Sequence, residues 1–248
     1  NIQNEKIAIK IDVERTESEV LNGSKKILEK NNCFVQIEYI ENFRIKIDNF
    51  FQKLNYNKIV YTKSDTNEAY FADGYRNRRV VVYDGDTGEY LRHWGAYGEL
   101  PNDDYDFGDR DPLGPAPRQF STVHGLVGSK DGLIYVADRR GNRIQGFDQS
   151  GEFLAEKIIA PLTRASGSAF VVVLSPDPEQ RWLYLADGTN HKVWTLRRDD
   201  LEVVGEFGRG GRQVGQFLRP HGMSIDSQGS LYVGEASTGR RVQKFIAS

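Results

Sequence analysis

His124 and His221 are the two residues of this sequence whose type and spacing are best suited to chemistry. Each is followed by a glycine and an apolar stretch, in His124-Gly125-Leu126-Val127 and His221-Gly222-Met223-Ser224-Ile225. Each also lies the same number of residues ahead of a strand that recurs along the chain. Neutral imidazoles that meet from equivalent places are good ligands for zinc or a similar divalent transition metal. Two imidazoles make a weak site, so a metal centre needs a third ligand. The alternative is that both histidines only line a channel.

The elements that position these histidines are repeated short strands. Four versions of one strand end in an acidic residue, at Asp73, Asp138, Asp187 and Glu235, and each is followed by a polar turn and a second strand. The last two intervals are about 50 residues, close to the roughly 40–50 residues of a propeller blade. An insertion over residues 97–119 explains the longer first interval. We therefore expect residues 67–248 to form about four blades, with both histidines at the start of innermost strands that face the central channel.

The first and last of these blades are incomplete in the sequence. The first lacks its innermost strand, and the last stops before a fourth strand. Propellers avoid exposed sheet edges by closing into a ring, and an uncovered edge favours association with another chain. We expect an open ring or a covered edge, and an open ring would self-associate through its propeller edges.

Residues 1–66 have a different composition and periodicity. Ile7, Ile9 and Ile11 alternate with polar or small residues, a pattern typical of a strand, and residues 33–37 predict a second strand. Residues 16–31 and 43–54 have the spacing of amphipathic helices, and the first opens on a capping box. Residues 58–63 predict a third strand. This order predicts a small α/β segment with part of a parallel or mixed sheet.

The turns of the repeated unit resemble those of NHL-type β-propellers. The similarity is carried by Asn77-Arg78-Arg79-Val80, Asn142-Arg143-Ile144 and Asn190-His191-Lys192-Val193. The expected fold class is therefore mainly β, an incomplete NHL-type β-propeller with a small N-terminal α/β segment. A narrower resemblance, to peptidyl-α-hydroxyglycine α-amidating lyase and its bacterial relatives, covers residues 67–248. It rests on Asp73-Gly74-Tyr75, Trp94-Gly95, Gln119-Phe120, Val123-His124, Ala137-Asp138-Arg139 and Pro220-His221.

This resemblance implies a six-bladed propeller that cleaves a carbinolamide N–C bond and releases a peptide amide and glyoxylate. It implies that His124 and His221 bind the metal, that Tyr75 takes the substrate hydroxyl proton, and that Arg139 contacts the substrate carboxylate or Tyr75. A metal ion and a nearby arginine would both favour a tyrosinate, and the planar guanidinium suits a carboxylate. The structural alternative is that Tyr75 and Arg139 are turn residues with hydrogen-bonding duties. His93 and His191 are expected to be structural.

Two departures from the lyase pattern bear on activity. A third histidine ligand and a further arginine belong to blades that would precede residue 67, and they are missing here. Where the family has methionine-proline-histidine-aspartate, this chain has Arg219-Pro220-His221-Gly222, without the aspartate that helps hold a structural calcium. We therefore expect the lyase activity to be impaired. The alternative is a non-catalytic propeller that binds a small peptide-like ligand or a protein partner.

The N-terminal segment resembles the C-terminal half of FkbM-type S-adenosylmethionine-dependent methyltransferases over residues 5–64. The similarity rests on Ile9-Lys10-Ile11-Asp12-Val13-Glu14, Val20-Leu21-Asn22-Gly23 and Val35-Gln36-Ile37-Glu38. Arg15 stands where that family has glycine, and the glycine-rich cofactor loop is absent from this sequence. Methyl transfer is therefore the least favoured function, S-adenosylmethionine is not expected as a cofactor, and the two halves have the character of a fusion.

Composition argues against several other classes of protein. A net charge of −2 gives no reason to expect nucleic acid as a partner. No stretch approaches the ~18 apolar residues of a membrane span. The acidic insertion, with Asp103, Asp104, Asp106, Asp109 and Asp111, has carboxylates suited to calcium, and a solvated loop is the alternative. The sequence does not indicate a compartment.

Overall fold

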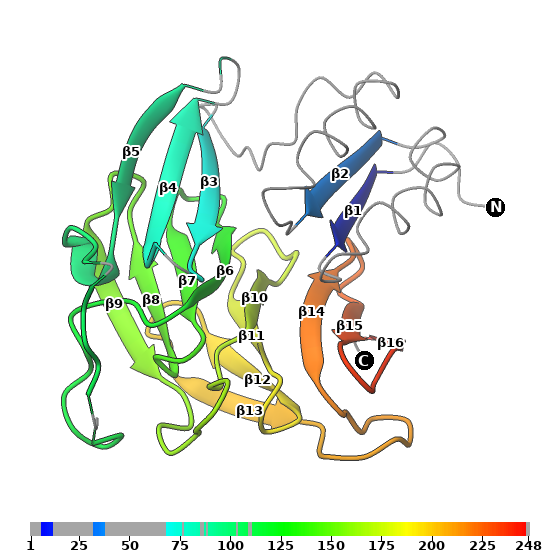
Figure 1. The fold of residues 1–248 in the computed structure, drawn as a ribbon. Helices are drawn as coiled ribbons and strands as arrows, with labels where there is room; N and C mark the ends of the chain where they lie inside the picture. The colour runs from blue at the N-terminus through cyan, green and yellow to red at the C-terminus, as the bar shows by residue number, and fades with distance from the viewer. Residues whose placement is uncertain are drawn as a thin grey trace. The chain divides into compact units, whose positions relative to one another are not determined.

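The computed structural model describes residues 6–11, 32–37, 68–75, 77–84, 87, 89–102, 104–108 and 111–246. The chain divides into two compact units, Asn1–Thr62 and Lys63–Ser248, whose elements are labelled in Figure 1. No helix among the described residues is long and apolar enough to cross a membrane.

The first unit is described at two strands, β1 (Lys6–Ile11) and β2 (Asn32–Ile37). They pair in parallel, with Ile7 opposite Cys33, as expected for two strands of a parallel or mixed sheet. The helices predicted at 16–31 and 43–54 and the strand predicted at 58–63 lie outside the described residues. The α/β character of this segment and its likeness to a methyltransferase therefore stay predictions.

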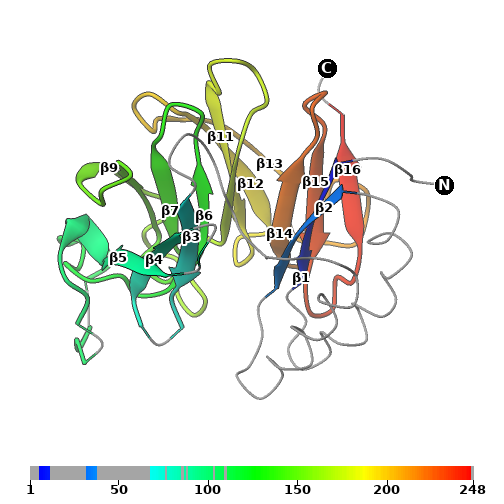
Figure 2. The same ribbon diagram turned by 90° about the horizontal axis from the view of Figure 1, so that it is seen from above.

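The described residues of the second unit form four antiparallel sheets, and each is one blade of a mainly β, propeller-like fold (Figures 1 and 2). Within each blade the strands pair in chain order, which is the repeated strand-turn-strand unit read from the sequence. Blade 1 contains β3 (Glu68–Asp73), β4 (Arg79–Asp84) and β5 (Tyr90–Trp94); blade 2 contains β6 (Val123–Gly128), β7 (Ile134–Asp138), β8 (Arg143–Phe147) and β9 (Phe153–Ile158); blade 3 contains β10 (Val171–Leu174), β11 (Trp182–Asp187), β12 (Lys192–Arg197) and β13 (Val203–Phe207); blade 4 contains β14 (Pro220–Ile225), β15 (Leu231–Glu235) and β16 (Val242–Phe245).

Apolar side chains fill the spaces between successive blades. Between blades 1 and 2, Tyr70, Val80 and Val82 share a buried cluster with Val136 and Phe147. Related clusters join blade 2 to blade 3 and blade 3 to blade 4. Side chains alternate between the two faces of a strand, so a blade packed on both sides is apolar on both faces. The repeat in the sequence therefore corresponds to one kind of interface between neighbouring blades, which the described residues form between blades 1 and 2, 2 and 3, and 3 and 4.

Within the part of the chain that the structure describes, blades 1 and 4 have three strands each, as the sequence predicts. The innermost strands β6, β10 and β14 lie next to one another, and β3 lies beside β6. The predicted insertion separates β5 from β6, and its start forms a single 3-10 turn, Ala96–Gly98. Self-association through the end blades stays a prediction.

Candidate functional site

Both histidines singled out in the sequence lie at the start of an innermost strand, His124 in β6 and His221 in β14. His124 is the additional residue of a β-bulge, because Val123 pairs with Asp138 while Gly125 pairs with Ala137. His221 stands in an equivalent bulge of blade 4, between Pro220 and Gly222. A bulge bends the strand and redirects a side chain, and bulges are common next to active sites. Both blades therefore position their imidazole at a β-bulge of the first strand.

The two imidazoles meet a third ring from the blade between them. Phe170 directly precedes β10, and it corresponds to His124 because Val171 pairs with Ala186 as Gly125 pairs with Ala137. The ring centroids of His124 and His221 lie 4.8 Å apart. The Phe170 centroid lies 5.4 Å from that of His124 and 5.5 Å from that of His221. Three successive blades thus contribute one equivalent ring each to a single cluster.

His124 is a buried residue whose ring is oriented by a hydrogen bond to the next blade. Its Nδ1 atom donates a hydrogen bond to the backbone carbonyl oxygen of Phe170 over 2.8 Å. A carbonyl oxygen can only accept, so this bond leaves the lone pair of the neutral ring on Nε2. Ligating histidines are commonly oriented by such a bond from their other nitrogen. The described residues include no group of three or more His, Cys, Asp or Glu side chains that could hold an ion, so metal binding by the two imidazoles stays a prediction.

Tyr75 and Arg139 lie beside the histidines. The Nη1 atom of Arg139 donates a hydrogen bond to the Tyr75 hydroxyl over 3.1 Å, and the Tyr75 ring centroid is 6.1 Å from that of His124. Gly74 permits this approach, since a Cβ atom there would lie 1.9 Å from the carbonyl oxygen of Val123. Any larger residue at position 74 would therefore push the Tyr75 turn away from β6.

Arg139 is a buried cation at the centre of this group. Its side chain stacks on Tyr75 and on Phe170, with the guanidinium carbon 5.3 Å and 5.2 Å from the two ring centroids. Its Nε atom is buried and has no hydrogen-bond acceptor among the described residues, and no described carboxylate forms an ion pair with it. A buried charge without a counter-ion is destabilising. This arrangement therefore favours an anionic ligand that would supply the missing partner.

Buried acids fix where the two histidine-bearing strands begin. Asp138 accepts hydrogen bonds from the backbone amides of Ser121 and Thr122, over 2.9 and 2.7 Å, just ahead of His124. In blade 4, Glu235 accepts one from the Leu218 amide over 2.6 Å, just ahead of His221. The acids that end the repeated strand therefore act on the site indirectly. They position the backbone at the start of the strands that carry the histidines.

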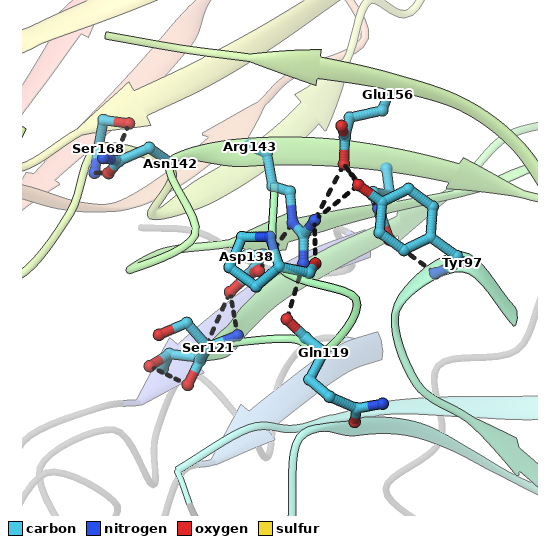
Figure 3. A network of polar contacts seen from close by, with 11 residues as sticks. Tyr97, Gln119, Ser121, Asp138, Asn142, Arg143, Glu156 and Ser168 are labelled. Atoms are coloured by element: carbon cyan, nitrogen blue, oxygen red, sulfur yellow. Dashed lines mark hydrogen bonds and ion pairs between the residues drawn. The ribbon is translucent and has the colours of Figure 1, made fainter. Parts of the chain in front are cut away.

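Each of these acids is held in turn by an arginine of its own blade. The Nε atom of Arg143 lies 2.9 Å from Asp138, and both side chains are fully buried (Figure 3). Arg241 pairs with Glu235 in the same way. Arg143 also donates to Glu156 over 3.0 Å, to the Tyr97 hydroxyl over 3.1 Å and to the Gln119 carbonyl over 2.8 Å. Burial lowers the pKa of Arg143, but the carboxylates outweigh it and raise the pKa above its usual value. Arg143 thereby attaches both ends of the insertion to blade 2.

The structure adds two residues to the site that sequence reasoning did not assign to it. Phe170 stands at the histidine position of blade 3, a correspondence that strand alignment could reveal. Arg219 was noted only as a departure from the lyase pattern, yet its guanidinium carbon lies 5.8 Å from the Phe170 ring centroid. The remaining histidines lie elsewhere, as expected: Nδ1 of His93 bonds the Tyr90 hydroxyl on outer strand β5, and His191 lies in the turn between β11 and β12.

The acidic insertion uses part of its carboxylates locally. Asp106 accepts a hydrogen bond from the Gly108 amide over 2.9 Å, and Asp111 accepts one from the Leu113 amide over 3.0 Å. Asp103 and Asp109 lie outside the described residues. Calcium binding by this loop therefore stays a prediction.

Comparison with known proteins gives a distant relative and a shared fold. No family model matches the chain. Peptidylglycine alpha-amidating monooxygenase of Rattus norvegicus is 26% identical over 190 residues, which are 72% of this chain and 17% of that protein. The chain thus spans a small part of this curated relative.

Solved structures match at lower identity. Hydrazine synthase of Kuenenia stuttgartiensis matches with a TM-score of 0.51 and 12% identity, over 75% of this chain and 48% of that chain. Virginiamycin B lyase of Staphylococcus aureus matches with a TM-score of 0.47 and 18% identity, over 75% and 54% of the two chains. The relative and the hydrazine synthase likeness support a β-propeller-like fold.

Proposed function

We propose that blades 1 to 4 carry the site of a metal-dependent C–N lyase, which acts on peptides that end in α-hydroxyglycine and releases the peptide amide and glyoxylate. The observation that carries this proposal is the meeting of His124 and His221, at 4.8 Å between ring centroids, beside the Tyr75–Arg139 hydrogen bond of 3.1 Å. The distant relationship to a peptidylglycine alpha-amidating enzyme supports the same substrate class.

Each side chain of the site has a role in this reaction. Arg139, a buried guanidinium with an Nε donor to spare among the described residues, would bind the C-terminal carboxylate of the substrate. The oxygen of Tyr75, as tyrosinate, would take the hydroxyl proton. The C–O bond then becomes a carbonyl, the C–N bond breaks, and its electron pair leaves on the amide nitrogen. That nitrogen gains the proton that Tyr75 removed, which regenerates the tyrosinate, so the products are the peptide amide and glyoxylate.

His124 and His221 would hold zinc or a similar divalent ion next to this substrate. When bound, such an ion supplies Lewis-acid stabilisation of the negative charge that develops on the hydroxyl oxygen. Catalytic zinc sites usually have three protein ligands. Because the described residues offer two imidazoles here, we expect the metal to bind weakly and turnover to be slow.

The test is metal content together with glyoxylate release. We expect about one equivalent of zinc in the wild type and in His93→Ala after loading, loss of that zinc in the His124→Ala/His221→Ala double variant, and glyoxylate from the first two proteins but not from the double variant. His93→Ala is the matched control, because it removes an imidazole on outer strand β5. Equal zinc content in the wild type and the double variant, or no glyoxylate from the zinc-loaded wild type, would contradict the lyase proposal.

A second candidate is a non-catalytic module that binds the same peptides. It is favoured by the stacking of Arg139 on Tyr75 and Phe170, a carboxylate-binding arrangement that needs no metal. This candidate predicts that a glycine-extended peptide binds the wild type and the double histidine variant equally well, with no glyoxylate from either protein.

A further inference from the structure

Arg219 occupies a defined position in the pseudo-symmetry of blades 2 and 4. In blade 2 the Arg139 amide donates to the Thr122 carbonyl over 2.8 Å, and in blade 4 the Ala236 amide donates to the Arg219 carbonyl over 2.9 Å. Arg219 therefore corresponds to Thr122, and Ala236 corresponds to Arg139. Each histidine-bearing blade thus contributes one arginine. In blade 2 the arginine is the residue whose amide donates this hydrogen bond, and in blade 4 it is the residue whose carbonyl accepts it.

The two arginines converge on one ring. The guanidinium carbons of Arg139 and Arg219 lie 5.2 Å and 5.8 Å from the Phe170 centroid, within the range of a cation–π contact. Nη2 of Arg219 also donates to the Ser166 hydroxyl over 3.3 Å, which ties its side chain to the loop ahead of β10. Phe170 in turn packs edge-on against both histidines. Arg219 is therefore part of the same cluster as the proposed catalytic groups.

The four acids that end the repeated strand already have partners within their own blades. Asp73 binds Arg79, Asp138 binds Arg143, and Glu235 binds Arg241. Asp187 accepts hydrogen bonds from Asn190 and Trp194. No described carboxylate forms an ion pair with Arg139 or with Arg219. The cluster therefore carries two cations that no carboxylate among the described residues neutralises.

We infer that Arg219 is a second anion-binding residue, and that the site selects peptides with an acidic side chain immediately before the C-terminal residue. This inference rests on the proposed function, in which Arg139 takes the C-terminal carboxylate. Neighbouring residues of an extended peptide are roughly 3.3–3.6 Å apart along the chain. A glutamate stem extends beyond this step, so its carboxylate can reach a second guanidinium that contacts the same Phe170 ring, while the C-terminal carboxylate stays on Arg139.

The experiment compares two unreactive peptides, acetyl-Ala-Glu-Gly and acetyl-Ala-Gln-Gly, by isothermal titration at constant ionic strength. They share the C-terminal carboxylate and differ in one charge. We expect the wild type to bind the glutamate peptide about tenfold more tightly, as for a hydrogen bond between charged groups. In Arg219→Met the ratio should fall to about one. Arg240→Met, which removes the same charge at an exposed turn residue, should keep the wild-type ratio.

The outcomes separate this inference from the function on which it rests. Equal binding of both peptides to the wild type would overturn the role of Arg219 and leave the carboxylate site intact. A preference lost equally in Arg219→Met and Arg240→Met would also overturn it, because the effect would then be that of net charge. Binding of neither peptide would overturn the proposed function itself, and the inference with it. The wild-type comparison needs no variant, so a misfolded Arg219→Met protein would not obscure the result.

Discussion

The Nδ1 atom of His124 donates a hydrogen bond over 2.8 Å to the backbone carbonyl oxygen of Phe170, in the next blade. Through this bond the orientation of an imidazole in blade 2 depends on the backbone of blade 3. Phe170 itself is fully buried and stands where blades 2 and 4 have histidine. The third ring of the cluster is therefore the natural position at which to add a metal ligand.

Phe170→His would bring a third imidazole to the cluster and keep the backbone carbonyl that orients His124. We expect its zinc affinity to exceed that of the wild type by about tenfold or more, because three-ligand sites hold zinc better than two-ligand sites. Competition with a chromogenic chelator measures this. Phe170→Leu is the control, since it keeps an apolar side chain and adds no ligand. The same zinc affinity in both variants would show that position 170 does not face the metal site.

Tyr75→Phe would remove the hydroxyl that accepts from Arg139 and retain the ring beside His124. We expect glyoxylate release to fall by about 100-fold or more, as for the loss of a general base, while binding of a glycine-extended peptide changes only a few-fold. Steady-state glyoxylate assays and titration calorimetry give the two values. Tyr90→Phe, on outer strand β5, should match the wild type in both. Undiminished turnover in Tyr75→Phe would exclude the tyrosine as the base.

Asp138→Ala would leave the Arg143 guanidinium buried without its main counter-ion. We expect the free energy of unfolding to fall by about 3–5 kcal/mol, as when one partner of a buried ion pair is removed. The equivalent Asp73–Arg79 pair of blade 1 is partly exposed, with 31% and 30% side-chain exposure for the arginine and the aspartate. Asp73→Ala should therefore cost about 1 kcal/mol or less.

Urea unfolding followed by tryptophan fluorescence measures both variants, because Trp94, Trp182 and Trp194 all lie in the blades. A similar loss in the two variants would mean that burial does not set the strength of these pairs. Asp138→Ala should also reduce zinc binding, because Asp138 holds the backbone just ahead of His124.

Stability should decrease in acid because of Glu235. Burial raises the pKa of this carboxyl, but the Leu218 amide and the Arg241 guanidinium outweigh burial and hold the pKa below its ordinary value of 4.5. The unfolded chain then binds the proton more readily than the folded chain. The contribution of Glu235 is fully present above pH 4.5 and is lost as the pH falls through the lowered folded value.

We therefore expect Glu235→Gln to be less stable than the wild type at pH 7 and to lose less stability between pH 5 and pH 3. Urea unfolding at several pH values measures this. The exposed Glu152 provides a control, because Glu152→Gln should retain the pH dependence of the wild type. If Glu235→Gln lost as much stability between pH 5 and pH 3 as the wild type, Glu235 would not be a cause of the acid sensitivity.

Much of the fold could be predicted because each blade repeats the same local sequence pattern. A strand of alternating faces ends in an acid, a polar turn follows, and an arginine or lysine opens the next strand. Asp138 and Arg143 show why this local pattern is so regular: their pairing needs both ends of one turn. The three described strands of blade 1 and of blade 4 were predictable for the same reason. For residues 1–66, the predicted helices lie outside the described residues.

The sequence by itself determined that this chain builds blades, and that His124 and His221 start equivalent strands. The tertiary structure alone decided that the two rings meet and that Phe170 stands between their strands. It also decided that Arg139 and Arg219 reach the same ring from different blades. The physical reason is that hydrogen bonding within a strand pair is local in the chain, whereas distances across the inner strands depend on how successive blades pack. The bulges at both histidines are likewise a property of strand register, which sequence spacing alone does not specify.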